Sequence, residues 1–394
     1  MSESIALGFC NNVDYEIVWN AEVLEDLVIR YQIRAHELSA LAEIRSERDL
    51  VVSILGFMRT SQGGERFVGG SEILERFAAR FEKKVTLGGT SVRAAIAMRK
   101  LGHRSALHLI TQNEHVRRLI PQDIPYVCSN ESDSIYPHLI VQFGAGDRVK
   151  AGEIDICARQ PNRLIYHCNA DRIAMRIAPD FAILIEDAKV LLVSGFNAMQ
   201  SKQLLLERLR EVMNLLECLP KDATVFLEDG GYHDASFRKL IYGTLGRRID
   251  VYSMNEDELQ SHLGRRIDLG DVGQARQALK ELNEVIPVAV IVLHTRHWAL
   301  AYGIGASRYA AALRAGVTMA TTRFRYGDDF TRADYDGIAS RAPNAAGAEF
   351  AFAFNSVARD GAFCVPVPDV EQENATTIGL GDAFVGGFLP ALLA

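Results

Sequence analysis

A glycine-rich segment near the C-terminus carries the residues best suited to chemistry. It is Thr376-Thr377-Ile378-Gly379-Leu380-Gly381-Asp382, between a strand-like run at 363–368 and a helical run at 383–393. Two glycines let the backbone approach a phosphate closely, and the free N–H groups of a helix start point at negative charge. An aspartate at the same helix start can accept a proton from a hydroxyl. The segment therefore predicts an anion hole at Gly379, Leu380 and Gly381 beside a general base, Asp382, as phosphoryl transfer requires.

A plain loop with a helix-capping aspartate is the alternative for this segment, and local grounds leave it open. Two other phosphate-binding motifs are excluded. The chain has no G-x-x-x-x-G-K-[ST] motif, and Gly303-Ile304-Gly305 lacks the third glycine of a dinucleotide fingerprint.

Several other polar residues come directly after predicted strands. In open α/β sheets ligands bind beyond the carboxyl ends of the strands, so we expect these residues at one edge. Carboxylates there can hold magnesium, which prefers oxygen ligands and keeps much of its water. An Asn-x-x-Glu before a helix is also a capping box, and both interpretations stay open. The residues are Glu228 at the end of 224–228, Asn255 and Glu258 after 249–253, His294 at the end of 288–294, and Thr295 directly after it.

The first apolar run, 5–9, is followed by Asn12 and Asp14. Amide and carboxylate groups in a cleft can recognise a polyol through directional hydrogen bonds, although a simple turn is the alternative. Gly88 and Gly89 would let backbone N–H groups approach the same ligand.

The elements that must position these residues are those of an α/β protein. From residue 189 onward strand-length apolar runs alternate with helical stretches, which is typical of a parallel sheet covered by helices. Earlier in the chain, 51–57, 134–143 and 147–166 predict short strands without crossover helices. These would form a small sheet that closes over the ligand edge as a lid. The predicted boundaries are approximately 1–14, 73–125 and 170–394 for the large core, and 15–72 and 126–169 for the lid.

The bulk composition narrows the class further. With 43 Lys and Arg against 50 Asp and Glu, the net charge is −7, and neither sign forms a long block, so nucleic acid is not an expected partner. No stretch is apolar enough for a membrane span, and the N-terminus has no signal-like segment, so we expect a cytoplasmic protein. Six scattered cysteines predict neither a zinc site nor disulfides. The oligomeric state stays open.

Residues 377–382 resemble the T-x-G-x-G-D signature of the ribokinase-like kinases. Further segments, in the same order and spread over nearly the whole chain, are similar to the ADP-dependent glucokinase/phosphofructokinase family. This resemblance implies a ribokinase-like three-layer α/β core with a small β-rich lid. It also implies transfer of the terminal phosphoryl group of Mg-ADP to glucose or fructose 6-phosphate. The segments are 8–14, 87–89, 162–165, 192–199 and 293–295.

The resemblance also assigns roles to individual residues. Asp382 would be the base and Gly379 to Gly381 the anion hole. The sugar-binding residues would be Asn12, Asp14, Glu65, Gly88 and Gly89. Arg163 would reach a phosphate as the lid closes, although an exposed strand arginine without a partner is the alternative. Apart from the resemblance, a phosphorylated acceptor needs a cationic pocket, which Arg148, Lys150 and Arg163 could form. The nucleotide would contact His294, Thr295 and Thr377, and Mg²⁺ would contact Glu228, Glu258 and Asn255.

One position departs from the family pattern. Phe226 stands where the family's H-x-E motif has its histidine, so the polar support of Glu228 is either missing or supplied from elsewhere. Two alternatives therefore remain: an ATP-dependent carbohydrate or nucleoside kinase of the same superfamily, and a sugar-binding regulatory protein without turnover.

Overall fold

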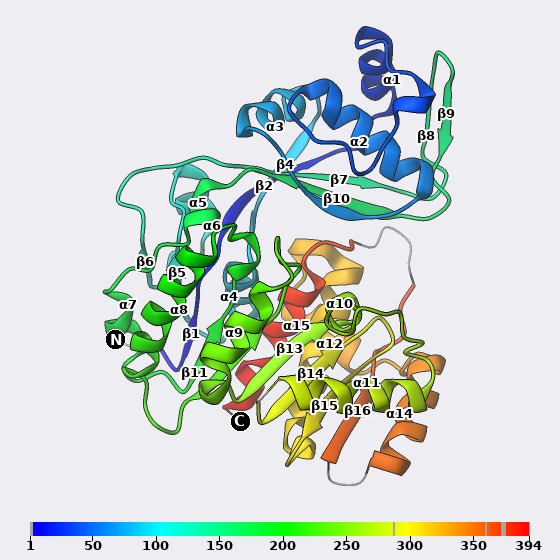
Figure 1. Ribbon diagram of the computed structural model, residues 1–394. Coiled ribbons are helices and arrows are strands. Elements are labelled where there is room, and N and C mark those ends of the chain that lie inside the picture. The colour runs from blue at the N-terminus through cyan, green and yellow to red at the C-terminus, as the bar shows by residue number, and fades with distance from the viewer. Residues whose placement is uncertain (1–2, 287, 359–360, 372–375, 394) are drawn as a thin grey trace.

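The computed structural model describes residues 3–286, 288–358, 361–371 and 376–393. Its largest element is a nine-stranded sheet in the order β16-β15-β14-β13-β12-β11-β1-β5-β6. All neighbouring strands are parallel except for β15, which is antiparallel to both its neighbours. The mainly parallel α/β sheet predicted from the sequence is thus confirmed (Figure 1). The strands are β1 (Ile5–Leu7), β5 (Ala106–Leu109), β6 (Tyr126–Cys128), β11 (Val190–Val193), β12 (Thr224–Glu228), β13 (Val251–Asn255), β14 (Val290–His294), β15 (Trp298–Gly303) and β16 (Ala362–Pro366).

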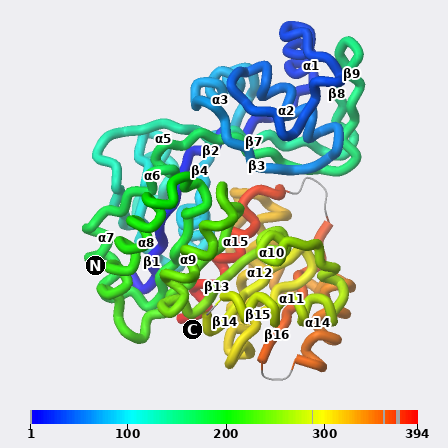
Figure 2. Tube along the Cα trace, viewed as in Figure 1, coloured from blue at the N-terminus to red at the C-terminus, as the bar shows by residue number. Residues whose placement is uncertain are grey.

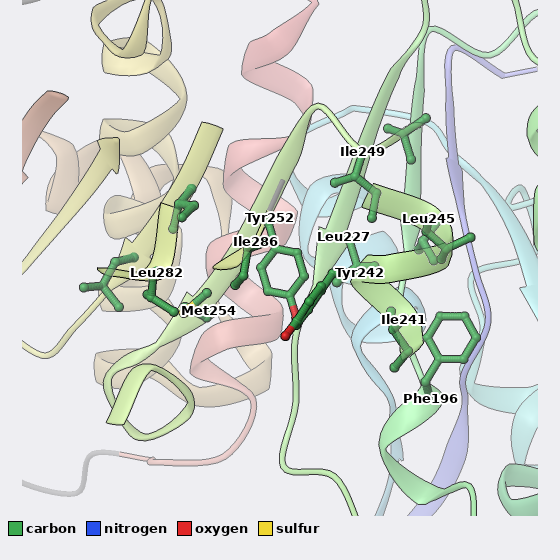
Figure 3. Packing of buried hydrophobic residues seen from close by; sticks show 14 of the residues in the cluster. Phe196, Leu227, Ile241, Tyr242, Leu245, Ile249, Tyr252, Met254, Leu282 and Ile286 are labelled. Carbon is green, nitrogen blue, oxygen red and sulfur yellow. The ribbon is translucent and has the colours of Figure 1, made fainter. Parts of the chain in front are cut away.

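Helices cover both faces of this sheet, because its central strands are apolar on both sides. One face packs against α8 (Lys202–Leu216), α9 (Phe237–Leu245), α10 (Glu256–Leu263), α11 (Val272–Val285) and α14 (Ala345–Ala358). Figure 3 shows part of this layer, where Tyr252 and Met254 of β13 lie between side chains of α9 and α11. The other face packs against α4 (Thr90–Lys100), α5 (Glu114–Leu119), α12 (Ala310–Tyr326) and α15 (Leu380–Phe388).

The remaining elements of the large domain are short. They are α6 (Ala170–Ala174), α7 (Phe181–Ile185), α13 (Arg332–Ala339) and the 3-10 helices η2 (Phe196–Ala198), η3 (Gly246–Arg248), η4 (Ala306–Tyr309), η5 (Gly327–Asp329) and η7 (Pro390–Leu392).

A second, five-stranded sheet in the order β3-β10-β7-β2-β4 forms the small domain at the top of Figure 1. The chain passes between the two sheets after β1, β4, β6 and β10, so the small domain is a double insertion, as the trace in Figure 2 shows. Its elements are β2 (Asn12–Ile17), β3 (Gly64–Phe67), β4 (Lys83–Gly88), β7 (His138–Phe143), β10 (Asn162–His167), the hairpin β8 (Arg148–Ala151) with β9 (Ile154–Cys157), α1 (Ala21–Arg30), η1 (Ala35–Glu37), α2 (Glu47–Thr60) and α3 (Ser71–Ala78).

The small sheet has one apolar and one polar face. Leu139 and Val141 of β7 and Leu164 and Tyr166 of β10 are buried against the small domain's helices. Successive side chains on a strand point to opposite faces. Arg163, which precedes buried Leu164 on β10, therefore lies on the other face of the sheet. That face carries the polar residues of β2, β10 and β3.

The structure corrects one element of the predicted lid. Residues 51–57 are helical, within α2, and not a strand. Every side chain from Leu50 to Met58 is buried, since the helix is enclosed by the rest of the small domain. A helix buried on all sides shows no 3.6-residue periodicity, and its β-branched residues then imitate a strand.

The sheets also divide the chain differently from the approximate boundaries. The boundary at 73 falls inside α3, and β4 pairs with β2 in the small sheet. Conversely, β6 lies in the range assigned to the lid but pairs with β5 of the large sheet. Within the described ranges, no helix is long and apolar enough to cross a membrane, and all six cysteines are free.

The position of α15 depends on a close contact with α12. A side chain at Gly387 would bring its Cβ against the Ala315 carbonyl and to 2.7 Å from Met319 Cβ. We predict that Gly387→Ala lowers the free energy of unfolding by about 1–3 kcal/mol through overpacking. In the control variant Gly243→Ala, the added methyl meets nothing within 4 Å. The free energy of unfolding should rise by about 0.5–1 kcal/mol, because alanine favours the helix more than glycine does. Urea unfolding measures both, and equal stabilities would contradict the predicted packing.

Candidate active site

The first turn of α15 places the glycines and the aspartate together. Gly379 is the N-cap and adopts φ 64°, a left-handed conformation that favours glycine. A Cβ there would also lie 2.9 Å from Arg93 Cδ and 3.2 Å from Arg323 Nε, so glycine lets two guanidinium groups approach the backbone. Asp382 stands three residues later, with its side chain 21% exposed. The helix start thus combines free N–H groups, two nearby cations and an accessible carboxylate.

Glu228 and His294 end two strands of the large sheet and meet beneath this turn. His294 Nε2 lies 3.2 Å from Glu228 Oε1, and both side chains are largely buried. The His294 ring stacks on Phe384 of α15 with centroids 4.6 Å apart. Phe226, in contrast, is buried against Phe388. The polar support of Glu228 is therefore supplied from β14 instead of from its own strand.

Asn255 and Glu258 form the capping box of α10. Asn255 Oδ1 accepts hydrogen bonds from the backbone N–H groups of Asp257 and Glu258, at 2.8 Å and 3.0 Å. Glu258 Oε2 accepts the Asn255 N–H at 2.9 Å. Burial, followed by the nearby charges of Asp229 and Glu228, raises the pKa of Glu258 well above its ordinary value. The capping interpretation is thus confirmed, and Glu258 also lies close to Glu228.

The described ranges contain no group of three or more His, Cys, Asp and Glu side chains that could hold a metal ion by themselves. Glu228 Oε2 is nevertheless buried with no hydrogen-bond partner in these ranges. A free, buried carboxylate oxygen fits a hydrated magnesium ion whose remaining ligands are water and phosphate. Magnesium at Glu228 and Glu258 stays a prediction.

The predicted sugar-binding residues lie where the small domain joins the large one. Asn12 of β2 is opposite Gly88 of β4. The Asn12 side-chain amide donates to Asp14 Oδ1, and Arg93 Nη2 donates to Asp14 Oδ2 at 2.7 Å. A Cβ at Gly88 would lie 2.5 Å from Asp14 Oδ2, and a Cβ at Gly89, which has φ 92°, would lie 2.7 Å from the Cys10 carbonyl oxygen. Gly89 is therefore required by the backbone of this junction, and Gly88 leaves room for the Asn12 and Asp14 side chains.

The Asp14 carboxylate is buried, and burial raises its pKa to about 6. The adjacent Arg93 opposes this rise, while the negative charges of Glu16 and Asp382 add to it. The charges of Asp14 and Asp382 thus interact, with Arg93 between them, although the two residues come from different domains.

Glu65 and Arg163 occupy the polar face of the small sheet. Glu65 Oε1 lies 2.9 Å from His167 Nε2. Burial lowers the pKa of Arg163, although Asp382, Glu65 and Asp257 oppose this. No hydrogen bond or ion pair of the Arg163 guanidinium is found among the described residues. Arg163 is thus a cation of the small domain that lies within electrostatic range of Asp382 on α15 and Asp257 on α10.

Thr295 follows His294, and Thr377 precedes the first turn of α15, so their contacts with a nucleotide stay a prediction. Thr295 Oγ1 donates to the Trp298 carbonyl at 2.8 Å and so closes the turn between β14 and β15. Thr377 lies two residues before the N-cap of α15.

Sequence reasoning missed three residues of the site: Arg93, Arg323 and Asp328. Arg323 Nε donates to the Ile378 carbonyl at 2.7 Å, and its Nη1 pairs with Asp328. Burial acts to raise the pKa of Asp328, but Arg323 and Arg93 outweigh it and lower that pKa to about 2. A signal was present for Arg93, which is a charged residue in the apolar first turns that follow Gly88-Gly89.

Residues 3–387 match the ADP-specific phosphofructokinase/glucokinase conserved region. The chain belongs to this family. By sequence alone, no curated protein matches it. Family membership indicates a sugar kinase, and the resemblance noted in the sequence is confirmed.

Solved structures of the family share the whole fold. A phosphofructokinase from Pyrococcus horikoshii OT3 with AMP is 17% identical with a TM-score of 0.78, covering 100% of this chain and 98% of that one. A hypothetical ADP-dependent phosphofructokinase from the same organism is 18% identical with a TM-score of 0.77 and the same coverage. An ADP-dependent kinase in complex with fructose-6-phosphate and ADPbetaS is 12% identical with a TM-score of 0.76, covering 100% and 94%.

The raised pKa of Asp14 predicts a pH-dependent cost in stability. The ionised form is disfavoured in the folded state, so stability falls as pH rises from the ordinary pKa of 3.8 to about 6. Asparagine escapes this cost. Replacing Asp14 also removes a partner of buried Arg93, which costs stability at every pH. We therefore predict only the pH dependence: the stability of Asp14→Asn relative to wild type rises by about 1–2 kcal/mol between pH 5 and pH 8.

Urea unfolding at the two pH values measures this gain. Asp155→Asn is the control, because Arg148 lowers the pKa of Asp155 and this carboxylate is therefore ionised at both pH values. Its replacement should change the free energy of unfolding equally at pH 5 and pH 8. A stability difference between Asp14→Asn and wild type that is the same at both pH values would contradict the buried, ionisable carboxylate.

Proposed function

We propose that this chain transfers the terminal phosphoryl group of Mg-ADP to a hydroxyl of a hexose or hexose phosphate. The observation that carries the proposal is the start of α15, where Asp382 stands beside a helix N-terminus and 3.8 Å from Arg93 Nε. Arg93 also binds Asp14 at 2.7 Å. The proposed base, the proposed anion-binding turn and the proposed hydroxyl-recognising carboxylate therefore lie around one guanidinium group.

In this mechanism the acceptor hydroxyl lies between Asp14 and Asp382. Asp382 takes its proton while the hydroxyl oxygen attacks the terminal phosphorus of the nucleotide, and AMP leaves with the electrons of the broken P–O bond. Backbone N–H groups at Gly379, Leu380 and Gly381 stabilise the charge on the phosphoryl oxygens. Magnesium, when bound near Glu228 and Glu258, would neutralise phosphate charge.

The small domain completes the site. Arg163 lies on its polar face within electrostatic range of Asp382, and Glu65 lies on the same face beside His167. Closure would bring Arg163 to the phosphates and exclude water, which otherwise competes with the sugar as acceptor. Arginine suits this task because its planar donor fork matches phosphate oxygens.

ADP as donor is proposed from the family, and fructose 6-phosphate from the solved complex of an ADP-dependent kinase. Of the three cations considered for a phosphorylated acceptor, Arg148 pairs with Asp155 at 2.6 Å. Arg148 and Lys150 both belong to the β8–β9 hairpin, at the far end of the small domain in Figure 1. Arg163 is therefore the cation best placed for a substrate phosphate.

The test is transfer from Mg-ADP and from Mg-ATP, separately, to glucose and to fructose 6-phosphate. We expect AMP and a sugar phosphate to form from Mg-ADP. Asp382→Asn should lower kcat by about 10²–10⁴-fold, because it removes the base while keeping the shape of the side chain. Acceptor binding should persist in this variant.

Asp271→Asn is the matched control. Asp271 caps α11 by accepting the Gln274 N–H at 2.8 Å, and asparagine caps as well as aspartate. Transfer from Mg-ATP but not from Mg-ADP would show that ATP, and not ADP, is the phosphoryl donor. A folded protein that binds sugar but transfers no phosphoryl group from either nucleotide would overturn the proposed reaction.

A further inference from the structure

Arg93 is a buried cation at the meeting point of the two domains. Its side chain is 5% exposed and lies on α4, which begins directly after the Gly88-Gly89 junction. Three negative side chains on β2, η5 and α15 converge on it, and a fourth from β2 lies next to them. The distances to Asp14, Glu16, Asp382 and Asp328 are 2.7, 3.4, 3.8 and 3.9 Å.

The two edges of the Arg93 guanidinium differ. Nη2 donates to Asp14 at 2.7 Å and lies 3.4 Å from both Glu16 Oε1 and Thr86 Oγ1. Nε and Nη1 make no hydrogen bond with any residue in the described ranges. Nε faces Asp382 Oδ2 at 3.8 Å, too far for a hydrogen bond but close enough for a strong charge interaction. The guanidinium thus binds the acceptor side firmly and faces the base side with free donors.

The anion-binding turn is fitted around this side chain. A Cβ at Gly379 would lie 2.9 Å from Arg93 Cδ and 3.1 Å from Arg93 Nη1. The free donors of Arg93 therefore lie against the turn that precedes Asp382. Lysine could not occupy this place in the same way, because its single ammonium group cannot span two carboxylates with fixed geometry.

We propose that Arg93 is a positioning residue that holds Asp14 and Asp382 around one buried cation, so that a single acceptor hydroxyl can be bound by one carboxylate and deprotonated by the other. The inference rests on the proposed function. It assigns to Arg93 the geometry of the acceptor site, whichever sugar is bound.

The electrostatic surroundings of Asp14 make the proposal measurable through pH. Arg93 is the cation that opposes the burial-raised pKa of Asp14, which is about 6. His138 of β7 lies opposite Asp14, and burial holds its pKa well below the ordinary value, so it stays neutral. The charged groups near Asp14 are Arg93 on α4, Glu16 on β2, Lys84 on β4, Asp382 on α15, and Asp328 on η5 next to Arg93.

The experiment compares the pH dependence of kcat/KM for the acceptor in wild type, Arg93→Gln and Arg93→Lys. Loss of the cation disfavours the ionised form of Asp14, so the acidic limb in Arg93→Gln should move upward by about one pH unit or more. KM for the acceptor should rise about tenfold or more. Arg93→Lys should keep the limb near the wild-type pH but lower kcat, since charge remains and the fork is lost.

Arg80→Gln is the matched control, because Arg80 pairs with buried Glu47 inside the small domain at 2.6 Å. It should lower stability and leave the acidic limb unchanged. A purely structural Arg93 would give the same result as Arg80, and an unmoved limb in folded Arg93→Gln would overturn the proposal. If that variant does not fold, an unchanged kcat in Arg93→Lys would overturn it.

Failure of the proposed function is distinguishable from failure of this inference. If wild type transfers no phosphoryl group, carbon-13 NMR titration of the Asp14 carboxyl in wild type and Arg93→Gln tests the coupling without turnover. Calorimetric binding of fructose 6-phosphate to the same proteins accompanies it. A higher pKa of Asp14 and weaker binding of fructose 6-phosphate in Arg93→Gln would support the inference. No change in either quantity would overturn it.

Discussion

The arrangement of the site depends on one constraint: the buried charge of Arg93 must be compensated. A guanidinium removed from water is costly unless carboxylates surround it, and breaking such a pair leaves an uncompensated buried charge. Asp14 from the start of the small domain and Asp382 and Asp328 from the C-terminal part of the large domain meet this need. Segments far apart in the sequence are therefore held together at one point, and that point is where the proposed acceptor hydroxyl would lie.

Local signals were sufficient for much of the fold and the site. Glycines before a helix, and polar residues at the ends of apolar strands, follow from backbone chemistry, and they correctly placed Glu228, Asn255 and His294 along one edge. The prediction of a strand at 51–57 was wrong, because the helix found there is buried on all sides and its sequence shows no helical periodicity. The convergence on Arg93 was not predictable, because it arises from how the small domain folds back on the large one.

Phe226 departs from the family's H-x-E motif, and the structure gives Glu228 a polar partner on another strand. Phe226 and Glu228 lie on the same side of β12, and the former now fills apolar space against Phe388. His294, two strands away, lies 3.2 Å from Glu228 and also stacks on the helix that carries Asp382. Glu228 and the first turns of α15 are thus linked through His294, so phenylalanine at position 226 does not leave Glu228 without a polar partner.

The most direct test of the account is a crystal structure with a non-hydrolysable Mg-ADP analogue and fructose 6-phosphate bound together. The account predicts that one sugar hydroxyl lies at hydrogen-bond distance, about 2.6–3.2 Å, from both Asp14 and Asp382, with the terminal phosphate at Gly379 to Gly381. A sugar bound away from Asp382, or a terminal phosphate held by other elements, would contradict it.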